Sequence, residues 1–203
     1  AFDDPYSGAQ TYINGKNVIL RLFSENDLEE YTKLTENVAD KGEFYPLHIP
    51  SLEIIKKEFG EKGWADKDDG GMLICDKKGK MVGDIWFFKS SVNIITGYEI
   101  GYQIFNKNDY GKGYMSEALS LFSAYLFNIK PIERLGLFII SENKGSIQVA
   151  KKCGYKYEGT LRRTVREHLN FFDYESYSLL KEEILSLREL LKKINQVITR
   201  RWR

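Results

Sequence analysis

One segment of this chain constrains its fold more than any other: the run RLGLFII at residues 134–140, in which almost every position is apolar. A half-exposed strand alternates apolar and polar residues, whereas a strand without a polar face has to be covered on both sides. The chain therefore needs a sheet with a packed layer on each face. With 203 residues, of which 42% are hydrophobic, it is long enough to build such a core within one domain.

Residue patterns on either side of this strand alternate between strand and helix. Runs rich in branched and aromatic residues predict strands, which we place at 17–23, 96–105 and 134–140, with a hairpin across 70–90 and a final strand pair across 157–180. Apolar residues at helical spacing predict helices, which we place at 24–38, after Ser51, at 114–128, at 143–153 and within 181–203. This order of elements predicts a mixed α/β sheet.

The last segment has a pattern of its own. Its apolar residues recur near a seven-residue rhythm, at Ile184, Leu187, Leu191, Ile194 and Ile198. The rhythm predicts an amphipathic helix, which packs either on its own domain or on a partner such as a second copy of the chain. We therefore divide the chain into an N-terminal extension, a main domain and a C-terminal helical extension, with bounds 1–16, 17–180 and 181–203.

Charge and cysteine content argue against several classes of function. The formal net charge is +1, whereas general nucleic-acid-binding proteins carry a strong basic excess. No apolar run is long enough to cross a bilayer, and no secretory signal pattern opens the chain. Cys75 and Cys153 lie far apart, which suggests neither a disulfide framework nor a metal site. We expect a cytoplasmic protein that binds no metal, nucleic acid or membrane.

The segment NDYGKGYMSEAL, residues 108–119, places two glycines immediately before a predicted helix. The first amides of a helix carry partial positive charge, point outward and bind phosphate oxygens. Gly111 and Gly113 lack the Cβ atoms that would keep such oxygens away from the backbone. Lys112 adds a cation between them. This chemistry suits a pyrophosphate and needs no metal.

Two common phosphate-binding motifs do not match this segment. A dinucleotide fingerprint, G-x-G-x-x-G, requires a third glycine where this chain has Ser116. A P-loop requires G-x-x-x-x-G-K-S/T, and the sequence contains no such string. Taken alone, the segment is also compatible with a plain turn into a helix.

The segments around the loop narrow this choice. EIGYQIF (99–105) precedes it, and LGLFIISENKGSIQVAKKCGYKYEGTLR (135–162) follows it. Together they resemble the core of GNAT-superfamily N-acetyltransferases, in particular the branch of ribosomal-protein N-terminal acetyltransferases and spermidine acetyltransferase-like enzymes. The resemblance covers roughly 17–180, although Asn108 stands where the family commonly has glutamine or arginine. It implies a mixed central sheet whose two middle strands splay apart around acetyl-CoA.

The resemblance also implies which residues bind acetyl-CoA, the acyl donor of the family. Tyr102 and Ile104 would offer backbone groups to the pantetheine, and Asn143 and Ser146 would lie near the thiol end. The pyrophosphate would lie against the loop residues Gly111, Lys112, Gly113, Tyr114 and Met115.

Amine acetylation needs two proton transfers, and the resemblance suggests a residue for each. Glu99 stands where several relatives carry the base that deprotonates the amine; its alternative is an ordinary charged strand residue. Many relatives protonate the departing thiolate with a tyrosine, but this chain has Ala150 there. Ser146 is the candidate replacement, because the serine of an N-x-x-S pattern has this role in some relatives. Alternatively, Asn143 and Ser146 only begin the helix, and solvent supplies the proton.

Residues of the acceptor site follow from position rather than from a motif. Strand alternation puts Gln103 on the same face as Glu99. Tyr45 and Trp86 are further candidates for the lining, although each aromatic residue also suits simple packing.

Together these features predict transfer of an acetyl group from acetyl-CoA to a primary amine by direct attack in a ternary complex. The acceptor is either a protein N-terminus or a small molecule. Two alternatives stay open at this point: the absence of the customary tyrosine suits a non-catalytic CoA-binding or regulatory module, and the C-terminal helix suits a scaffold or a homodimer that assembles through it.

Overall fold

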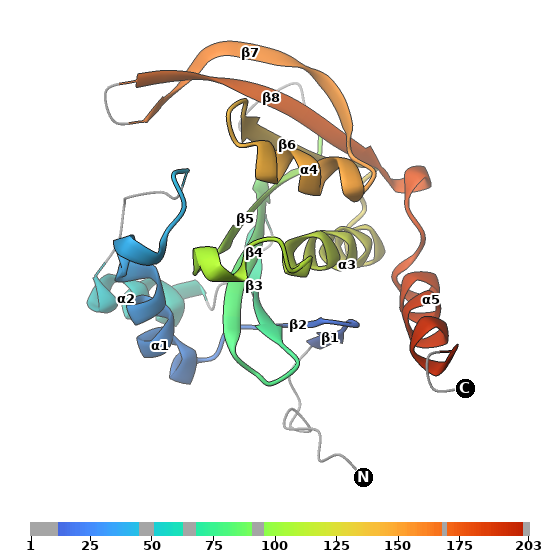
Figure 1. The fold of residues 1–203 in the computed structure, drawn as a ribbon, viewed down its shortest axis with the longest axis horizontal. Coiled ribbons are helices and arrows are strands. Elements are labelled where there is room, and N and C mark those ends of the chain that lie inside the picture. The colour runs from blue at the N-terminus through green and yellow to red at the C-terminus, as the bar shows by residue number, and fades with distance from the viewer. Residues whose placement is uncertain (1–11, 45–50, 63–67, 91–95, 168–169, 201–203) are drawn as a thin grey trace.

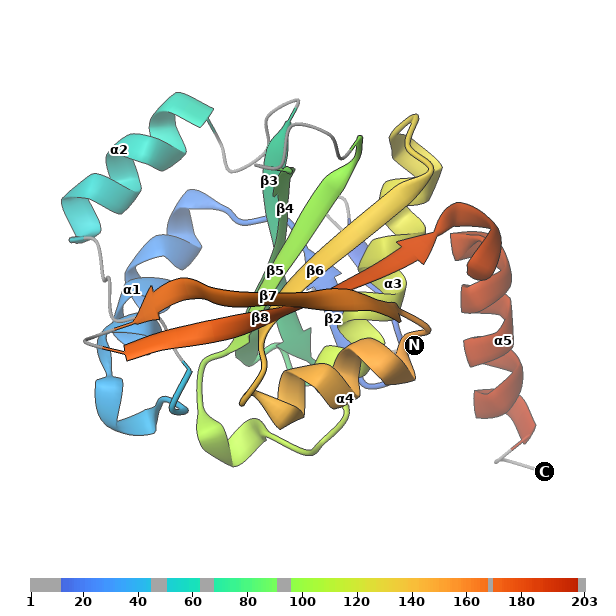
Figure 2. The ribbon, with the colours of Figure 1, turned by 90° about the horizontal axis from the view of Figure 1, so that it is seen from above.

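The fold is an 8-stranded sheet in the order β1-β2-β3-β4-β5-β6-β8-β7, with helices on both faces (Figures 1 and 2). The predicted mixed α/β fold is therefore confirmed, including the C-terminal helix. The computed structural model describes residues 12–44, 51–62, 68–90, 96–167 and 170–200. The strands are β1 (Tyr12–Asn14), β2 (Val18–Arg21), β3 (Asp69–Asp76), β4 (Met81–Lys89), β5 (Tyr98–Ile104), β6 (Arg134–Ile140), β7 (Lys156–Glu167) and β8 (Asn170–Leu180). The α-helices are α1 (Leu28–Glu36), α2 (Leu52–Lys62), α3 (Tyr114–Ile129), α4 (Lys144–Lys152) and α5 (Leu187–Arg200).

One strand pair differs from all the others. Neighbouring strands run antiparallel except β5 and β6, which are parallel. Parallel neighbours need a crossover connection, usually a helix, and α3 is the helix between these two strands. The glycine loop that opens α3 therefore lies at the carboxyl end of β5, which is where α/β sheets bind ligands.

The two faces of the sheet bury separate hydrophobic clusters. The larger cluster includes Leu119 of α3 and Ile147 of α4. On the other face, Tyr31 of α1 and Phe59 of α2 pack against the smaller cluster. Figure 2 shows α1 and α2 on one side of the sheet and α3 and α5 on the other. The apolar segment that opened the sequence analysis is buried as expected in β6, with Leu135, Leu137, Ile139 and Ile140 all at most 7% exposed.

The sequence patterns did not reveal β1. Tyr12–Asn14 lies within the predicted N-terminal extension and pairs antiparallel with β2, with Ile13 opposite Leu20. Three residues are too few for an alternation pattern to stand out. The edge of the sheet therefore includes part of the segment that precedes the predicted main domain.

The described part of α5 packs on its own domain. Apolar side chains from this helix and the turn before it lie against the larger cluster, namely those of Ile184, Leu187, Leu190, Leu191 and Ile194. This is the first of the two arrangements that the seven-residue rhythm predicted. Among the described residues, no helix has both the length and the apolar character required to cross a membrane.

A buried ion pair fixes the start of α1. Arg21 of β2 donates two hydrogen bonds to Asp27, at 2.6 and 2.7 Å, and Ser24 N donates to the same carboxylate at 2.7 Å. Such bidentate, charge-assisted bonds are geometrically specific. They hold the first turn of α1 against the sheet and so set the position of Tyr31, one turn further along.

Candidate active site

β5 and β6 lie side by side only at their starts. The pairing joins Tyr98 to Leu135 and Glu99 to Gly136 and goes no further. Beyond this point β5 is paired only with β4, and β6 only with β8. The facing edges of the two strands therefore carry backbone N–H and C=O groups without a strand partner, and an extended ligand can bond to such an edge. The predicted splayed middle strands are present.

The glycine loop has the backbone conformation of an anion site. Gly111 and Gly113 have φ angles of 74° and 80°, in the left-handed region that residues with a Cβ atom rarely adopt. A Cβ atom built at either position would meet no heavy atom within 4 Å, so the space in front of both glycines is open. Within the described residues, their amides have no hydrogen-bond partner. The loop thus offers unblocked amides at the N-terminus of a 16-residue helix.

Lys112, the cation between the two glycines, forms an ion pair with the carboxylate of Asp109. Lys112 Nζ lies 2.6 Å from Asp109 Oδ1, and Lys80 Nζ lies 2.8 Å from Asp109 Oδ2. Burial would raise the pKa of Asp109, but hydrogen bonds from the two lysines outweigh it and hold the pKa below its usual value. Both lysine side chains remain about half exposed, at 48% and 55%. This cluster keeps a net positive charge next to the open amides.

The N-terminus of α4 brings Ser146 against β5. Asn143 Oδ1 accepts a hydrogen bond from Ser146 N at 3.0 Å, so Asn143 caps the helix. Ser146 Oγ lies 2.7 Å from the hydroxyl of Tyr102, which comes from β5. Burial raises the pKa of the Tyr102 phenol, which therefore stays protonated at neutral pH. A hydrogen-bonded pair of hydroxyl groups thus links β5 to the helix that follows β6.

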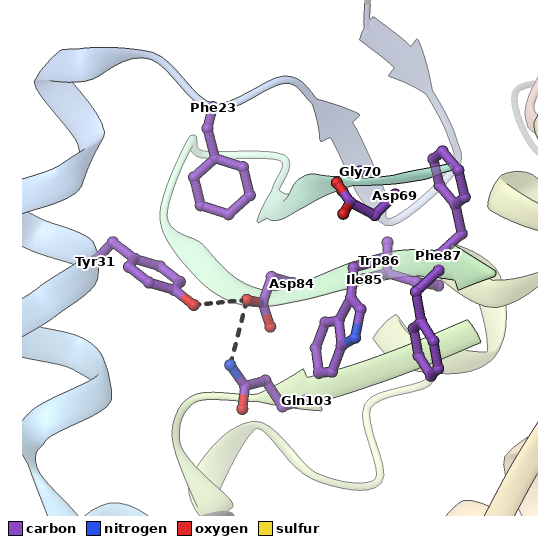
Figure 3. Close-up of a pocket in the computed structure, with 11 residues that line it drawn as sticks. Phe23, Tyr31, Asp69, Gly70, Asp84, Ile85, Trp86, Phe87 and Gln103 are labelled. Atoms are coloured by element: carbon purple, nitrogen blue, oxygen red, sulfur yellow. Dashed lines mark hydrogen bonds between the residues drawn. The ribbon is translucent and has the colours of Figure 1, made fainter. Parts of the chain in front are cut away.

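A cavity of about 510 Å³ lies beside β4 and β5, on the face that carries α1. Trp86 and Gln103, two of the three predicted acceptor residues, line it (Figure 3). The indole ring of Trp86 lies over Gly101, where an added Cβ atom would be 2.3 Å from Trp86 Cε2. The remaining lining comes from α1, the segment before it, β3 and β4, and consists of Phe23, Tyr31, Asp69, Gly70, Gly71, Asp84, Ile85, Phe87 and Phe88.

Asp84 of β4 is the buried charged group of this cavity, at 5% exposure. Its Oδ2 atom accepts hydrogen bonds from the Tyr31 hydroxyl at 2.9 Å and from Gln103 Nε2 at 3.2 Å. Its Oδ1 atom is buried and has no hydrogen-bond partner among the described residues. Burial raises the pKa of Asp84 to about 7, against the lowering effect of both hydrogen bonds and of Lys41.

Glu99, the predicted base, lies elsewhere on the same face. It is 6% exposed and accepts a hydrogen bond from the Ser90 hydroxyl. It is paired with Gly136, at the closed end of the diverging strands. Gln103 lies opposite Asp84 and four residues after Glu99, so about 13 Å of strand separates the backbone positions of the two acidic residues. Glu99 is not among the residues that line the cavity.

Comparison with known proteins shows the family to which this chain belongs. Residues 17–156 match the family described as "Acetyltransferase (GNAT) domain". The chain belongs to the GNAT acetyltransferase family. It is 27% identical over 172 residues to the uncharacterized N-acetyltransferase YnaD of Bacillus subtilis (strain 168), a match that covers 85% of this chain and 98% of that protein.

Two solved structures share the fold of this GNAT protein. Spermidine N-acetyltransferase from Vibrio cholerae, in complex with CoA and spermine, superposes with a TM-score of 0.70 at 17% identity, over 82% of this chain and 97% of that one. The ribosomal L7/L12 alpha-N-protein acetyltransferase RimL, in complex with CoA, superposes with a TM-score of 0.68 at 19% identity, over 84% and 98%. Both belong to the branches that the sequence resembles. The chain is thus an acyl-CoA-dependent acetyltransferase of the GNAT family.

This GNAT protein departs from the family pattern at Ala150. The side chain of Ala150 is fully buried, at 0% exposure, within the larger cluster. A tyrosine in this position would overpack the core. The phenol nearest to Ser146 comes instead from β5, as Tyr102.

Some sequence predictions fall outside what the structure describes. Tyr45, the third predicted acceptor residue, lies in the segment 45–50, outside the described residues. The structure does describe Met115, which was predicted at the pyrophosphate. Its side chain lies in the core at 7% exposure, so only its backbone can take part in the loop. Within the described ranges, no three His, Cys, Asp or Glu residues are grouped to hold a metal.

Sequence reasoning missed three groups of this site: the Asp84 carboxylate and the hydroxyl groups of Tyr31 and Tyr102. One signal was available. Asp84 stands in MVGDIWFF, a strand whose neighbouring residues are apolar, and a lone carboxylate in such a strand is costly to bury without a role. The two tyrosines gave no signal, because their partners lie far away in the sequence.

Proposed function

We propose that this protein transfers an acetyl group from acetyl-CoA to a primary amine by direct attack within a ternary complex. One observation carries the proposal: β5 parts from β6 beyond Glu99, leads into the loop with open amides at Gly111 and Gly113, and also lines a carboxylate-bearing cavity. A donor bound along the wedge and an acceptor bound in the cavity would then meet across β5.

The chain's own residues fit acetyl-CoA. The amides of 111–115, together with Lys112, suit its pyrophosphate. The free edge of β5 at Tyr102 and Ile104 suits the amide groups of its pantetheine. Asn143 and Ser146, at the start of α4, would lie near its thiol end. When bound, acetyl-CoA supplies the activated acyl group; the protein supplies position and proton transfer.

The reaction fixes where the protons go. The ammonium loses one proton before its nitrogen attacks, the new C–N bond forms as the C–S bond breaks, and a second proton from nitrogen ends on the thiolate. Ser146 is the proposed donor to the thiolate. Its Oγ lies 2.7 Å from the Tyr102 hydroxyl, which holds the serine in place. The second proton from nitrogen replaces the one that the serine gives to the thiolate, so both hydroxyl groups end protonated.

The test begins with acetyl-CoA alone, which should raise the melting temperature of the protein in a concentration-dependent way. Mass spectrometry of products from a library of primary amines then identifies the acceptor, with N-acetylated amine and free CoA in equal amounts. An unchanged melting temperature over a broad range of acetyl-CoA concentrations would contradict the proposal. A raised one with no acetylated product would favour the non-catalytic CoA-binding module, which the buried Ala150 also suits.

A further inference from the structure

We propose that Asp84 is the acceptor-binding carboxylate of this enzyme: its Oδ1 atom receives the ammonium group of the amine and takes the proton that the amine loses before attack. The inference rests on the proposed function and deepens it, because it names both a residue and a substrate class. It assigns to Asp84 the role that the sequence predicted for Glu99.

The geometry of Asp84 leaves one buried oxygen without a hydrogen-bond partner among the described residues. Tyr31 and Gln103 both donate to Oδ2, and Figure 3 shows the carboxylate held between these side chains, with Trp86 beside it. Oδ1 has no partner among the described residues although the side chain is buried. A buried oxygen without a partner is costly in free energy. A ligand that donates an N–H bond to Oδ1 removes that cost.

The rest of the cavity selects for a cation. Among the described residues, its lining contains two carboxylates, Asp69 and Asp84, and no lysine, arginine or histidine. Aromatic side chains form much of the wall, among them Phe23, Tyr31 and Trp86. Aromatic faces attract ammonium groups, and anionic ligands would meet two negative charges. The acceptor is therefore a primary ammonium compound with a small apolar or aromatic body.

The titration of Asp84 suits a base at neutral pH. Its pKa of about 7 reflects burial, opposed by hydrogen bonds from Tyr31 and Gln103 and by the charge of Lys41. Among the described residues, Asp69 lines the same cavity as Asp84, and Glu99 lies on the same face of β5 as Gln103. Above pH 7 the carboxylate is ionised and accepts a proton; below pH 7 it is already protonated and cannot. The proton taken from the ammonium passes from Oδ1 to solvent, leaving a neutral amine with a free electron pair.

Glu99 is less suited to this role for geometric reasons. Its Oε1 atom accepts a hydrogen bond from the Ser90 hydroxyl, and its side chain packs near Gly136, where β5 and β6 are still paired. It also lies outside the lining of the cavity. Glu99 therefore has a structural role, at the point where β5 and β6 part.

The first experiment measures binding and needs no turnover. The probes are 2-phenylethylamine and its neutral isostere 2-phenylethanol, titrated by calorimetry at pH 8 without acetyl-CoA. Asp84→Asn should weaken amine binding by about 10- to 100-fold, the range of one charge-assisted contact, and leave the alcohol unchanged. Asp69→Asn, which removes the exposed carboxylate of the same cavity, should also weaken amine binding, but by less than about threefold, because an exposed charge contributes little.

Several outcomes would overturn the assignment: no amine binding to the wild type up to millimolar concentration, equal binding of amine and alcohol, or equal amine binding by Asp84→Asn and wild type. These outcomes can be distinguished from failure of the proposed function, because acetyl-CoA binding is measured separately, as a shift in melting temperature. A protein that binds the amine through Asp84 but never acetylates it would refute the proposed transfer and keep the cation site.

The pH profile adds a readout that a merely structural role would not move. In the wild type, amine binding and kcat/KM should both rise with pH through about 7. Tyr31→Phe removes a hydrogen bond that lowers the pKa of Asp84, so the rise should shift to higher pH. Glu99→Gln should leave the midpoint in place. A midpoint that moves with Glu99→Gln and not with Tyr31→Phe would overturn the assignment.

Discussion

The two sides of β5 are built by different means. On the proposed donor side, the site consists of backbone: two left-handed glycines, open amides and a free strand edge, all within one stretch from β5 to α3. On the acceptor side, the site consists of side chains from α1, β3, β4 and β5, and their carboxylate is placed by a tyrosine and a glutamine from other elements.

This difference explains what each side can tolerate. A backbone site suits a part of the donor that does not vary, such as a pyrophosphate, and it depends on φ angles more than on residue type. A side-chain site can change its acceptor by single substitutions without disturbing the donor. The two sides should therefore respond to mutation independently, and the following variants test that independence.

The largest effect is expected from Gly101→Leu. A Cβ atom at this position would lie 2.3 Å from Trp86 Cε2, so the indole ring has to move out of the cavity wall. Misplacement of about 1 Å can cost 100-fold in rate, and we expect kcat/KM for the amine to fall by about 100-fold. The shift in melting temperature caused by acetyl-CoA should stay the same.

The control for this variant is Gly136→Ala on β6, whose Cβ atom would meet nothing closer than 3.7 Å. It should behave like the wild type. A Gly101→Leu protein that loses acetyl-CoA binding as strongly as amine turnover would show that the two sides are not independent.

Ser146→Ala should have the next largest effect. Loss of a proton donor typically lowers the rate by about 100-fold or more, but solvent can protonate the thiolate in part, and we expect kcat to fall by about 10- to 100-fold. The affinity for acetyl-CoA should change little. Ser141→Ala, which removes a hydroxyl bonded to Asp173 O at the end of β6, serves as the control. An unchanged kcat for Ser146→Ala would leave solvent as the proton source.

A smaller effect is expected from Gly113→Ala, which tests the backbone character of the donor side. Alanine in the left-handed region costs about 1–2 kcal/mol, so the free energy of unfolding should fall by that amount, and acetyl-CoA should bind about tenfold more weakly because the amides turn away. Gly60→Ala in α2 is a matched change: its Cβ atom also meets nothing within 4 Å, but its φ is not left-handed. It should stabilise the protein by up to about 1 kcal/mol. If both variants behave alike, the φ angle is not what matters at Gly113.

The smallest effect should come from Lys112→Ala. Because Lys112 is half exposed and already paired with Asp109, its loss should weaken acetyl-CoA binding by no more than about fivefold. The loss should shrink further in high salt. Isothermal titration with CoA at two salt concentrations measures both quantities. A loss above 50-fold would mean that a side chain, and not the amides, dominates the donor side.

Much of the donor side was predictable because its parts are close in the sequence. The glycines, the helix after them and the strand before them lie within 98–129, and each has a local signature. The N-cap at Asn143, three residues before Ser146, is local in the same way. Even here, the ion pair between Lys80 and Asp109 was not predictable, because it joins residues from separate elements.

The acceptor side was predictable only in outline. Alternation along β5 put Gln103 on the correct face, but nothing in the sequence indicated that Tyr31 reaches Asp84 across 53 positions. That contact depends on how α1 lies on the sheet, which the buried pair of Arg21 and Asp27 sets.

The sequence by itself determined the elements other than β1, their order, the glycine loop and the family, because periodicity, turn chemistry and short motifs act over a few residues. Only the tertiary structure decided where β5 and β6 part, which carboxylate lines the cavity and which phenol meets Ser146. These depend on strand register and helix placement, and those are fixed by packing between residues that the chain keeps far apart.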